Sequence, residues 1–427
     1  MRYAYILIVL GASLALIGIT YAYRYTHPVY FADHWGYVEA WFQWQTGESN
    51  FWDFFHRKHN DHRIGLTKLT LVADFAWAHG SSFVLTTTML ALLLASGAAL
   101  GWAASDGAGT ADRIAASTLF AASLVGVTSL GNTSWPSQIQ FAFAQAVPIA
   151  LFLAALYLPG RLGTGIVLVL ALACAETMAN GFTAPLIAGA LLLAVTPYRS
   201  RGLLLIVGGV LALGLMLMPT ARDFTPNNNP ALGLSNILFF FGGASAVLEA
   251  AGVKAAVAIG LVASVSLAVG ALLFVMRGVT NDRASLVLLA TALYAAASLA
   301  AMAVVRGTGT PLTEALTSRY ATTSLVFLLS TGGFLYRQRA LLDPLGYLGA
   351  GLCAAAIAFS AQSDRALLEV ARRNAGLNQA YLSMALGPYD AGAYQNAYPD
   401  PEAVRRLTEY LRLHGKGIFR KNRSKGG

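Results

Sequence analysis

Long apolar runs alternate with short polar connections over most of this chain. Eleven runs stand out, at 3–23, 83–104, 111–130, 138–158, 163–177, 182–196, 202–219, 255–276, 285–305, 320–336 and 345–361. They are continuously rich in Leu, Ala and Val and lack the polar and apolar alternation of barrel strands. Most approach the length needed to cross a hydrocarbon core of about 30 Å, where the backbone must satisfy its own hydrogen bonds. The pattern predicts an all-α, polytopic membrane protein with about 11 transmembrane helices.

Four segments depart from simple crossing. Residues 64–79 are apolar but interrupted by charge, which favours a helix at the membrane interface or along a cavity. Residues 236–251 contain a Phe-Phe-Phe-Gly-Gly stretch and are interpreted as re-entrant. The runs at 163–177 and 182–196 are short and flank the polar residues 176–181, so this pair is expected to enclose a cavity.

Composition agrees with this division of the chain. The sequence is 56% hydrophobic and only 11% charged, with a mean hydropathy of +0.57. We expect a transmembrane catalytic domain over residues 1–361, with 24–82 forming a first outward loop, and a soluble tail over 362–427. The two cysteines, Cys174 and Cys353, lie in apolar runs, which argues against a disulfide framework and a Cys-based metal site. The net charge of +9 indicates contact with membrane lipids and phosphates, and no nucleic-acid motif accompanies it.

Basic residues in the connections give the orientation. With the N-terminus inside, every short inner loop carries one or two arginines: Arg113, Arg161, Arg199, Arg201, Arg277, Arg283, Arg337 and Arg339. The long first loop and the tail are also basic, but long segments translocate largely regardless of charge, so the short loops weigh more. The first loop is therefore expected outside.

Polar side chains gather in that first loop. Five of the seven histidines lie there, and residues 56–63 form an uninterrupted polar run, His-Arg-Lys-His-Asn-Asp-His-Arg. Asp33 and His34 follow the first apolar run by about ten residues. Further polar residues stand at the same expected ends of later helices: Lys68, Trp135, Gln138, Glu176, Asn180, Arg306, Arg319 and Tyr320. This layout predicts an active site at the outer membrane surface.

These residues carry a resemblance to a known superfamily. A first helix, a long loop with an early Asp beside an aromatic, a helix bearing Lys68, and many helices joined by basic inner loops resemble the GT-C superfamily of polyprenyl-phosphate-sugar-dependent glycosyltransferases. Asp33-His34-Trp35, the run 59–63 and Ser318-Arg319-Tyr320 are more similar to uncharacterised bacterial members than to the oligosaccharyltransferase or protein mannosyltransferase branches. The resemblance covers residues 1–340 as architecture, and its motifs are short.

The resemblance implies a function and a location. It implies transfer of a sugar from a polyprenyl-phosphate donor to a cell-envelope glycan or lipid acceptor, in a bacterial inner membrane, with the site facing the periplasm. The early acidic residue of the superfamily is a catalytic base or metal-proximal carboxylate, which by position is Asp33. Several branches carry an acidic pair where this chain has a single Asp, so dependence on a divalent metal stays open.

The chemistry independently requires these residue types. A carboxylate takes the proton from the acceptor hydroxyl, and cations hold the departing phosphate. Asp33 is the first candidate base and Asp61 the second, and the phosphate candidates are Arg63, Lys68, Arg306 and Arg319. The other expected substrate contacts are His34, His59, His62, Trp135, Gln138, Glu176, Asn180 and Tyr320.

Each assignment has an alternative. Asp33 is also suited to capping the helix that follows it. The i, i+3 spacing of His56, His59 and His62 suits either a metal ion or a solvated interfacial segment. Arg306 and Arg319 also suit lipid headgroups.

Two other functions compete with glycosyl transfer. A transporter or flippase for a lipid-linked or anionic solute requires polar groups near the bilayer midplane and repeat symmetry, and the sequence shows neither. A membrane acyltransferase requires a histidine paired with an acid, for which His59 and Asp61 are available.

Overall fold

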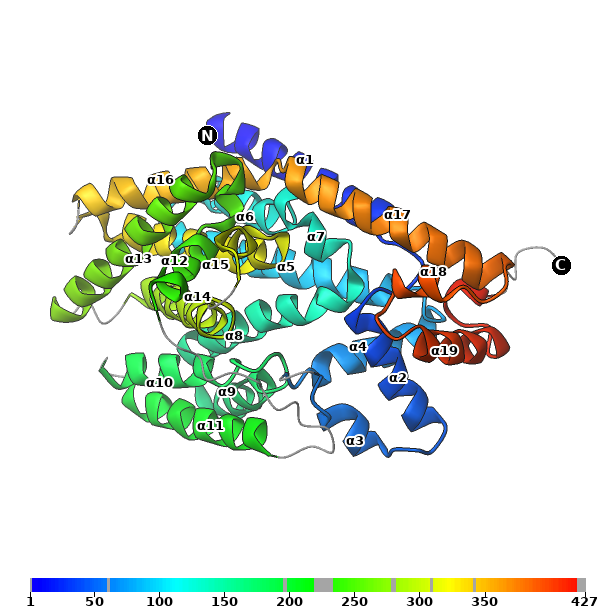
Figure 1. Ribbon diagram of the computed structural model, residues 1–427. Helices are drawn as coiled ribbons and strands as arrows, with labels where there is room; N and C mark the ends of the chain where they lie inside the picture. The colour runs from blue at the N-terminus through cyan, green and yellow to red at the C-terminus, as the bar shows by residue number, and fades with distance from the viewer. Residues whose placement is uncertain are drawn as a thin grey trace.

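The computed structural model describes residues 2–59, 62–194, 198–218, 233–277, 282–307, 310–340 and 343–420, except for the side chains of Arg2, Ser318 and Arg319. Within these ranges the chain is helical and contains no strand, only one isolated bridge between His59 and His62 (Figure 1). The all-α prediction is confirmed.

Among the described residues, eight of the predicted spans are helices long and apolar enough to cross a membrane. They are α1 (Arg2–Tyr25), α5 (Phe83–Ala104), α6 (Thr110–Leu124) continuing through η1 (Val127–Ser129) and α7 (Leu130–Thr133), η2 (Pro136–Gln138) with α8 (Ile139–Tyr157), α11 (Arg199–Leu217), α13 (Val253–Met276), α14 (Arg283–Arg306), and α16 (Asp343–Ser360). The chain is therefore a polytopic membrane protein. Length and apolar composition identify eight such helices in the described part of the chain, so the predicted count of 11 transmembrane helices is not confirmed.

The other three predicted spans are helices of different kinds. α9 (Gly160–Cys174) and α10 (Thr183–Ala194) are apolar but short, and they lie with α11 in one group below α8 (Figure 1). α15 (Ser318–Arg337) is long enough to cross, but polar side chains lower its hydropathy. It packs among α14, α16 and α5, where Ser324, Ser330 and Thr331 are buried. A helix enclosed by other helices does not require an apolar outer surface.

The segment at 236–251 enters the bundle and returns, as expected. α12 (Leu234–Ala244) starts beside the end of α14, where Asn236 Nδ2 donates to Ala303 O (2.8 Å). The chain turns at Ser245 and continues as η3 (Ala246–Ala251), whose Glu249 lies 3.7 Å from Arg365, beyond the end of α16. Because α14 and α16 both end on this side, α12 and η3 begin and finish at the same end of the bundle.

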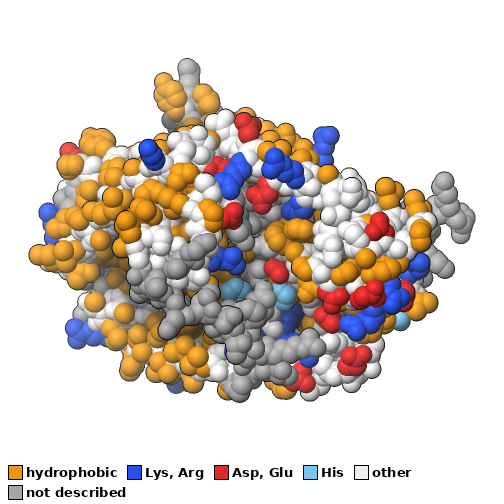
Figure 2. All heavy atoms as spheres, in the orientation of Figure 1, with side chains coloured by type: hydrophobic (Ala, Val, Ile, Leu, Met, Phe, Trp, Pro, Cys, Tyr) orange, Lys and Arg blue, Asp and Glu red, His pale blue; other side chains and the backbone are white. Residues whose placement is uncertain are grey.

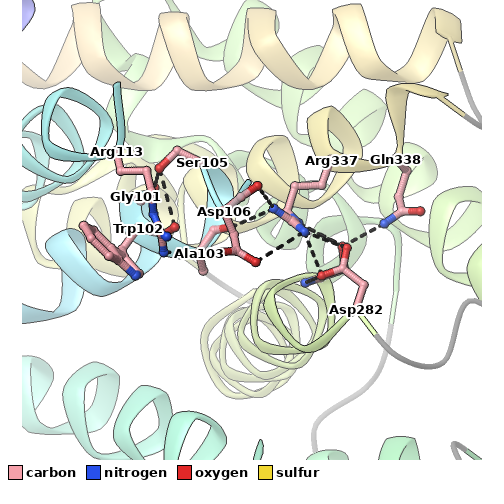
Figure 3. Close-up of polar contacts among 10 residues, drawn as sticks. Gly101, Trp102, Ala103, Ser105, Asp106, Arg113, Asp282, Arg337 and Gln338 are labelled. Carbon is pink, nitrogen blue, oxygen red and sulfur yellow. Dashed lines mark hydrogen bonds and ion pairs between the residues drawn. The ribbon is translucent and has the colours of Figure 1, made fainter. Parts of the chain in front are cut away.

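A charged network joins the helices at the opposite end (Figure 3). Arg337, in the last turn of α15, forms a bidentate pair with Asp282 at the start of α14, in which Nη2 donates to Oδ1 (2.8 Å) and Nε to Oδ2 (3.2 Å). Its Nη1 donates to the backbone oxygen of Asp106 (2.6 Å). Asp106 pairs with Arg113 (3.3 Å), whose guanidinium lies 3.6 Å from the Trp102 ring centroid. The network fixes the connection between α5 and α6 against α14 and α15.

The first loop and the tail form one helical layer at the other end. The loop contains α2 (Asp33–Gln45), α3 (Phe51–His56) and α4 (Gly65–Trp77), and the tail contains α17 (Asp364–Leu386), α18 (Ala391–Gln395), α19 (Pro401–Leu413) and η6 (Gly417–Phe419). Outside this layer, two short 3-10 helices, η4 (Leu312–Leu316) and η5 (Gln338–Ala340), precede and follow α15 in the chain. Figure 1 shows α2, α4, α18 and α19 together beside the bundle.

Specific contacts hold this layer together. The Trp41 ring stacks on Phe75 at 4.0 Å and meets Tyr410 of the tail edge-on at 5.8 Å. Lys416 Nζ donates to Phe75 O (2.8 Å). Residues 78–82 connect the end of α4 to the start of α5. Asp74 of α4 fixes this connection, because its carboxylate accepts from the backbone N–H groups of Ser82 (2.8 Å) and Val84 (2.7 Å). The tail therefore packs on the loop that carries the candidate residues, and residues 64–79 are helical without reaching across the bundle.

Candidate active site

Asp33 is the first residue of α2 and faces a histidine from the polar run of the first loop. Asp33 Oδ1 lies 3.2 Å from His59 Nε2. The two side chains are within ion-pair distance, although the ring N–H is not aligned for a good hydrogen bond. Ala32 occupies the N-cap position and no side chain caps this helix end. The capping role considered for Asp33 is therefore not what the structure shows.

A two-residue connection presents the histidine. His59 and His62 exchange both backbone hydrogen bonds (2.8 and 3.0 Å). Asn60 and Asp61, which lie between them, are outside the described residues, and with them the second candidate base, Asp61. The run 56–63 is therefore not one helical face, and the i, i+3 spacing that would suit a shared metal ion does not apply.

The surroundings of Asp33 keep its carboxyl ionised. Burial by itself raises the pKa of Asp33, but the contact with His59 and the influence of the nearby His62 and Arg306 side chains outweigh it, so the pKa lies below its ordinary value. The position in the first turn of α2 also favours a negative charge. About a third of the side chain (35%) stays exposed, so a substrate can reach it.

Tyr37 and Gln140 complete this part of the site. The Tyr37 ring meets the His59 ring edge-on at 4.7 Å, and its hydroxyl donates to Gln140 Oε1 (3.4 Å). Gly36 allows the close approach, since a Cβ there would lie 2.8 Å from His59 Cε1. Sequence reasoning missed both residues. The one available signal was that Tyr37 lies one helical turn after Asp33.

Glu176 and the α9 to α10 connection support the first loop from below. Glu176 Oε1 lies 3.0 Å from His56 Nδ1, and Glu176 Oε2 accepts from Gly65 N (3.3 Å). Ala179 N donates to His62 Nδ1 (3.4 Å). The neighbouring Asn180 turns to the bundle and donates to Ser298 Oγ (2.5 Å). Glu176 and His62 thus belong to one contact between distant segments, whereas Asn180 secures the connection itself.

Two predicted phosphate ligands are bonded to backbone carbonyls. Lys68 Nζ donates to Phe54 O (2.7 Å) and to Arg57 O, and the side chain is buried. Arg63 donates to His56 O (3.0 Å) and Met218 O (2.9 Å). In this arrangement Lys68 holds the loop together, Arg63 also joins the loop to the end of α11, and neither side chain is directed at Asp33.

The buried position of Lys68 makes stability depend on pH. Burial is the main cause that lowers its pKa from 10.5 to about 7. Between these values the unfolded chain binds a proton that the folded chain does not, so raising the pH favours folding by at most about 1.4 kcal/mol per pH unit. We expect the melting temperature in detergent to rise from pH 7 to pH 9 relative to Lys68→Met. Exposed Lys254→Met is the matched control and should keep the wild-type slope. Equal slopes in wild type and Lys68→Met would contradict this assignment.

Three predicted substrate contacts are buried. His34 is 1% exposed, lies against the Tyr30 ring at 4.2 Å, and has no hydrogen-bond partner for Nε2 among the described residues. Burial lowers the pKa of His34 to about 3, so it is neutral. Gln138 is buried at the start of α8, and Tyr320 is buried with its ring 6.0 Å from Phe239.

Of the two remaining predicted phosphate ligands, Arg306 lies near Asp33, and the side chain of Arg319 is outside the described residues. Arg306 ends α14 and is close enough to influence Asp33. Arg319 lies in the first turn of α15, but its side chain is outside the described residues, as is the segment 219–232. Among the residues described, no three His, Cys, Asp or Glu side chains are grouped to hold a metal ion.

Trp135 lines a separate cavity at the same end of the bundle. The cavity has a volume of about 480 Å³ and lies between the first loop, the α7 to α8 connection, η4 and α17. Its lining includes Phe31, Trp135, Glu314, Arg365, Glu369 and Arg372. Figure 2 shows acidic, basic and histidine side chains gathered in the middle of one face. The four tail residues of this lining, Arg365, Leu368, Glu369 and Arg372, were not predicted from the sequence.

No protein-family model, curated protein or solved structure matches this chain. The geometry around Asp33 is therefore the basis for assigning a function.

Proposed function

We propose that this protein is a membrane glycosyltransferase that moves a sugar from a polyprenyl-phosphate donor to a glycan or lipid acceptor of the cell envelope. The observation that carries the proposal is an ionised, partly exposed carboxylate, Asp33, surrounded by His59, His62 and Arg306 at one end of an apolar helical bundle. The GT-C-like layout of the sequence supports the same assignment.

The proposed reaction is a direct displacement. Asp33 accepts the proton of the acceptor hydroxyl while the oxygen of that hydroxyl attacks the anomeric carbon of the donor sugar. The bond between that carbon and the phosphate oxygen breaks, and polyprenyl phosphate leaves with the electron pair. Arg306 stabilises the charge that grows on the leaving phosphate. His59 keeps the carboxylate in place and ionised before the attack.

Reconstitution tests the reaction class. Purified protein in proteoliposomes is supplied with labelled polyprenyl-phosphate sugars carrying a hexose, an N-acetylhexosamine or a pentose, together with cell-envelope glycan and lipid fractions. We expect label in a glycan or lipid product and release of polyprenyl phosphate. Passage of the intact labelled donor to the other leaflet without cleavage would instead indicate a flippase.

Orientation is part of the proposal, because the donor is expected to be used at the periplasmic surface of a bacterial inner membrane. Two single-cysteine substitutions test the orientation. Glu48 is exposed in the first loop and Asp112 is exposed at the opposite end of the bundle, so the variants are Glu48→Cys and Asp112→Cys. Of the two native cysteines, Cys174 is fully buried, and Cys353 is partly exposed and faces Gly332 on a neighbouring helix, so the wild-type protein is labelled in parallel as the background. We expect a membrane-impermeant maleimide to label the first variant in intact cells and the second only after permeabilisation. The reverse pattern would contradict the orientation.

A further inference from the structure

The cavity beside Trp135 is built by segments that are far apart in the sequence. Phe31 comes from the first loop, Glu314 from η4, and Arg365, Glu369 and Arg372 from one face of the tail helix α17. A volume of about 480 Å³ falls in the range of small-molecule sites. We propose that this cavity binds a sugar residue of the acceptor glycan, an inference that rests on the proposed glycosyl transfer and extends it to a second subsite.

The charges of the lining favour a neutral, polyhydroxylated ligand. Arg365 and Arg372 donate hydrogen bonds, Glu314 and Glu369 accept them, and Asn132 does both. Two cations and two carboxylates bring no net charge, so a phosphate or a lipid headgroup would meet repulsion as well as attraction. Sugar hydroxyls are donors and acceptors at once and match this mixture.

One wall of the cavity is aromatic and fixed. The rings of Phe31 and Trp135 lie 4.8 Å apart, and Trp135 Nε1 donates to Phe31 O (3.2 Å). Such a surface suits the apolar C–H face of a sugar ring. A rigid surface of this kind also reduces the entropy lost on binding.

The tail helix α17 forms another wall of the cavity, and hydrogen bonds hold this helix in place. Arg373, next to the lining residue Arg372, donates to Ser134 Oγ (2.8 Å) and Ser134 O (3.2 Å). Arg365 donates to Thr313 O (3.3 Å) beside η4. These bonds attach the tail helix to both neighbouring walls, so the cavity exists before a ligand binds.

The position of Phe31 connects the cavity to the catalytic carboxylate. Phe31 precedes Asp33 by two residues, so their Cα atoms are within about 8 Å of each other. A glycan seated against Phe31 can therefore extend its terminal hydroxyl to Asp33. The tail helix would select the acceptor, whereas the first loop performs the transfer.

A binding measurement tests the subsite without requiring turnover. The full chain carrying Asp33→Asn is titrated by calorimetry in detergent with trisaccharides built from hexoses, N-acetylhexosamines or pentoses. The double variant Glu369→Gln with Arg372→Gln is compared on the same background, and exposed Arg405→Gln on α19 is the matched control. We expect at least one trisaccharide to bind, about tenfold more weakly to the double variant and within about twofold to the control.

The outcomes separate this inference from the proposed function. Failure of every trisaccharide to bind, or equal affinity of the double variant, overturns the subsite even if Asp33-dependent transfer is observed. Binding of short-chain phosphatidylglycerol or inorganic phosphate in place of the trisaccharides also overturns it. Trisaccharide binding that the double variant loses supports the subsite, even if the wild-type protein transfers no sugar.

Discussion

Asp33→Asn should lower sugar transfer by about 10²- to 10⁴-fold, the range expected when a general base is lost. The substitution keeps the size of the side chain and removes its ability to take a proton. Because Asp33 is partly exposed and caps no helix, the fold should be retained. Transfer from a labelled donor and the melting temperature are measured on the same preparations.

Asp53→Asn is the control for this experiment. Asp53 lies in the same loop, is exposed, and makes its contacts with Asn50 at the start of α3. We expect it to transfer sugar at close to the wild-type rate. Near wild-type transfer by Asp33→Asn would end the candidacy of Asp33 and direct attention to Asp61.

Arg337→Gln should have the largest effect on stability, about 2 to 3 kcal/mol. The side chains of Arg337 and Asp282 are only 13% and 23% exposed, and losing the cation leaves the carboxylate of Asp282 bonded to Ser285 alone within the described contacts. Unfolding in mixed micelles, followed by circular dichroism against increasing denaturing detergent, measures the change.

Asp106→Asn separates this pair from the rest of the network. The Asp106 side chain is 42% exposed and 3.8 Å from Arg337, while the stronger contact uses the backbone oxygen, which the substitution keeps. A loss below about 1 kcal/mol is expected. Equal losses in Asp106→Asn and Arg337→Gln would show that the bidentate pair is not the dominant contact.

The sequence predicted the helical spans well because lipid imposes a simple rule on them. A run such as 83–104 has to be apolar on most of its surface, and α5 covers the same residues. The segment 236–251 was interpreted as re-entrant from its Phe-Phe-Phe-Gly-Gly stretch, and in the structure the chain turns back between α12 and η3. The folded tail was not predicted, since α19 gains its stability from contacts with α2 that no local pattern reveals.

The site was predicted in part for a similar reason. Asp33 and His59 were both selected from the first loop, but their contact depends on how the 25 intervening residues fold. His34 was selected because it adjoins Asp33, yet successive residues on a helix point about 100° apart, and His34 turns to the core. Lys68 was selected as a free cation, although the carbonyls that hold it lie 11 and 14 residues earlier.

The composition of α15 has a consequence for biogenesis. This helix is 20 residues long, but its polar and charged side chains keep it out of the set of described helices apolar enough to span by themselves. During synthesis it therefore gains little by partitioning alone from the translocon into lipid. It must enter with α14, which precedes it, or wait for α16, whose Gly349 packs against its Gly332. Substitutions at that glycine contact should reduce the yield of inserted protein more than the activity of the molecules that do insert.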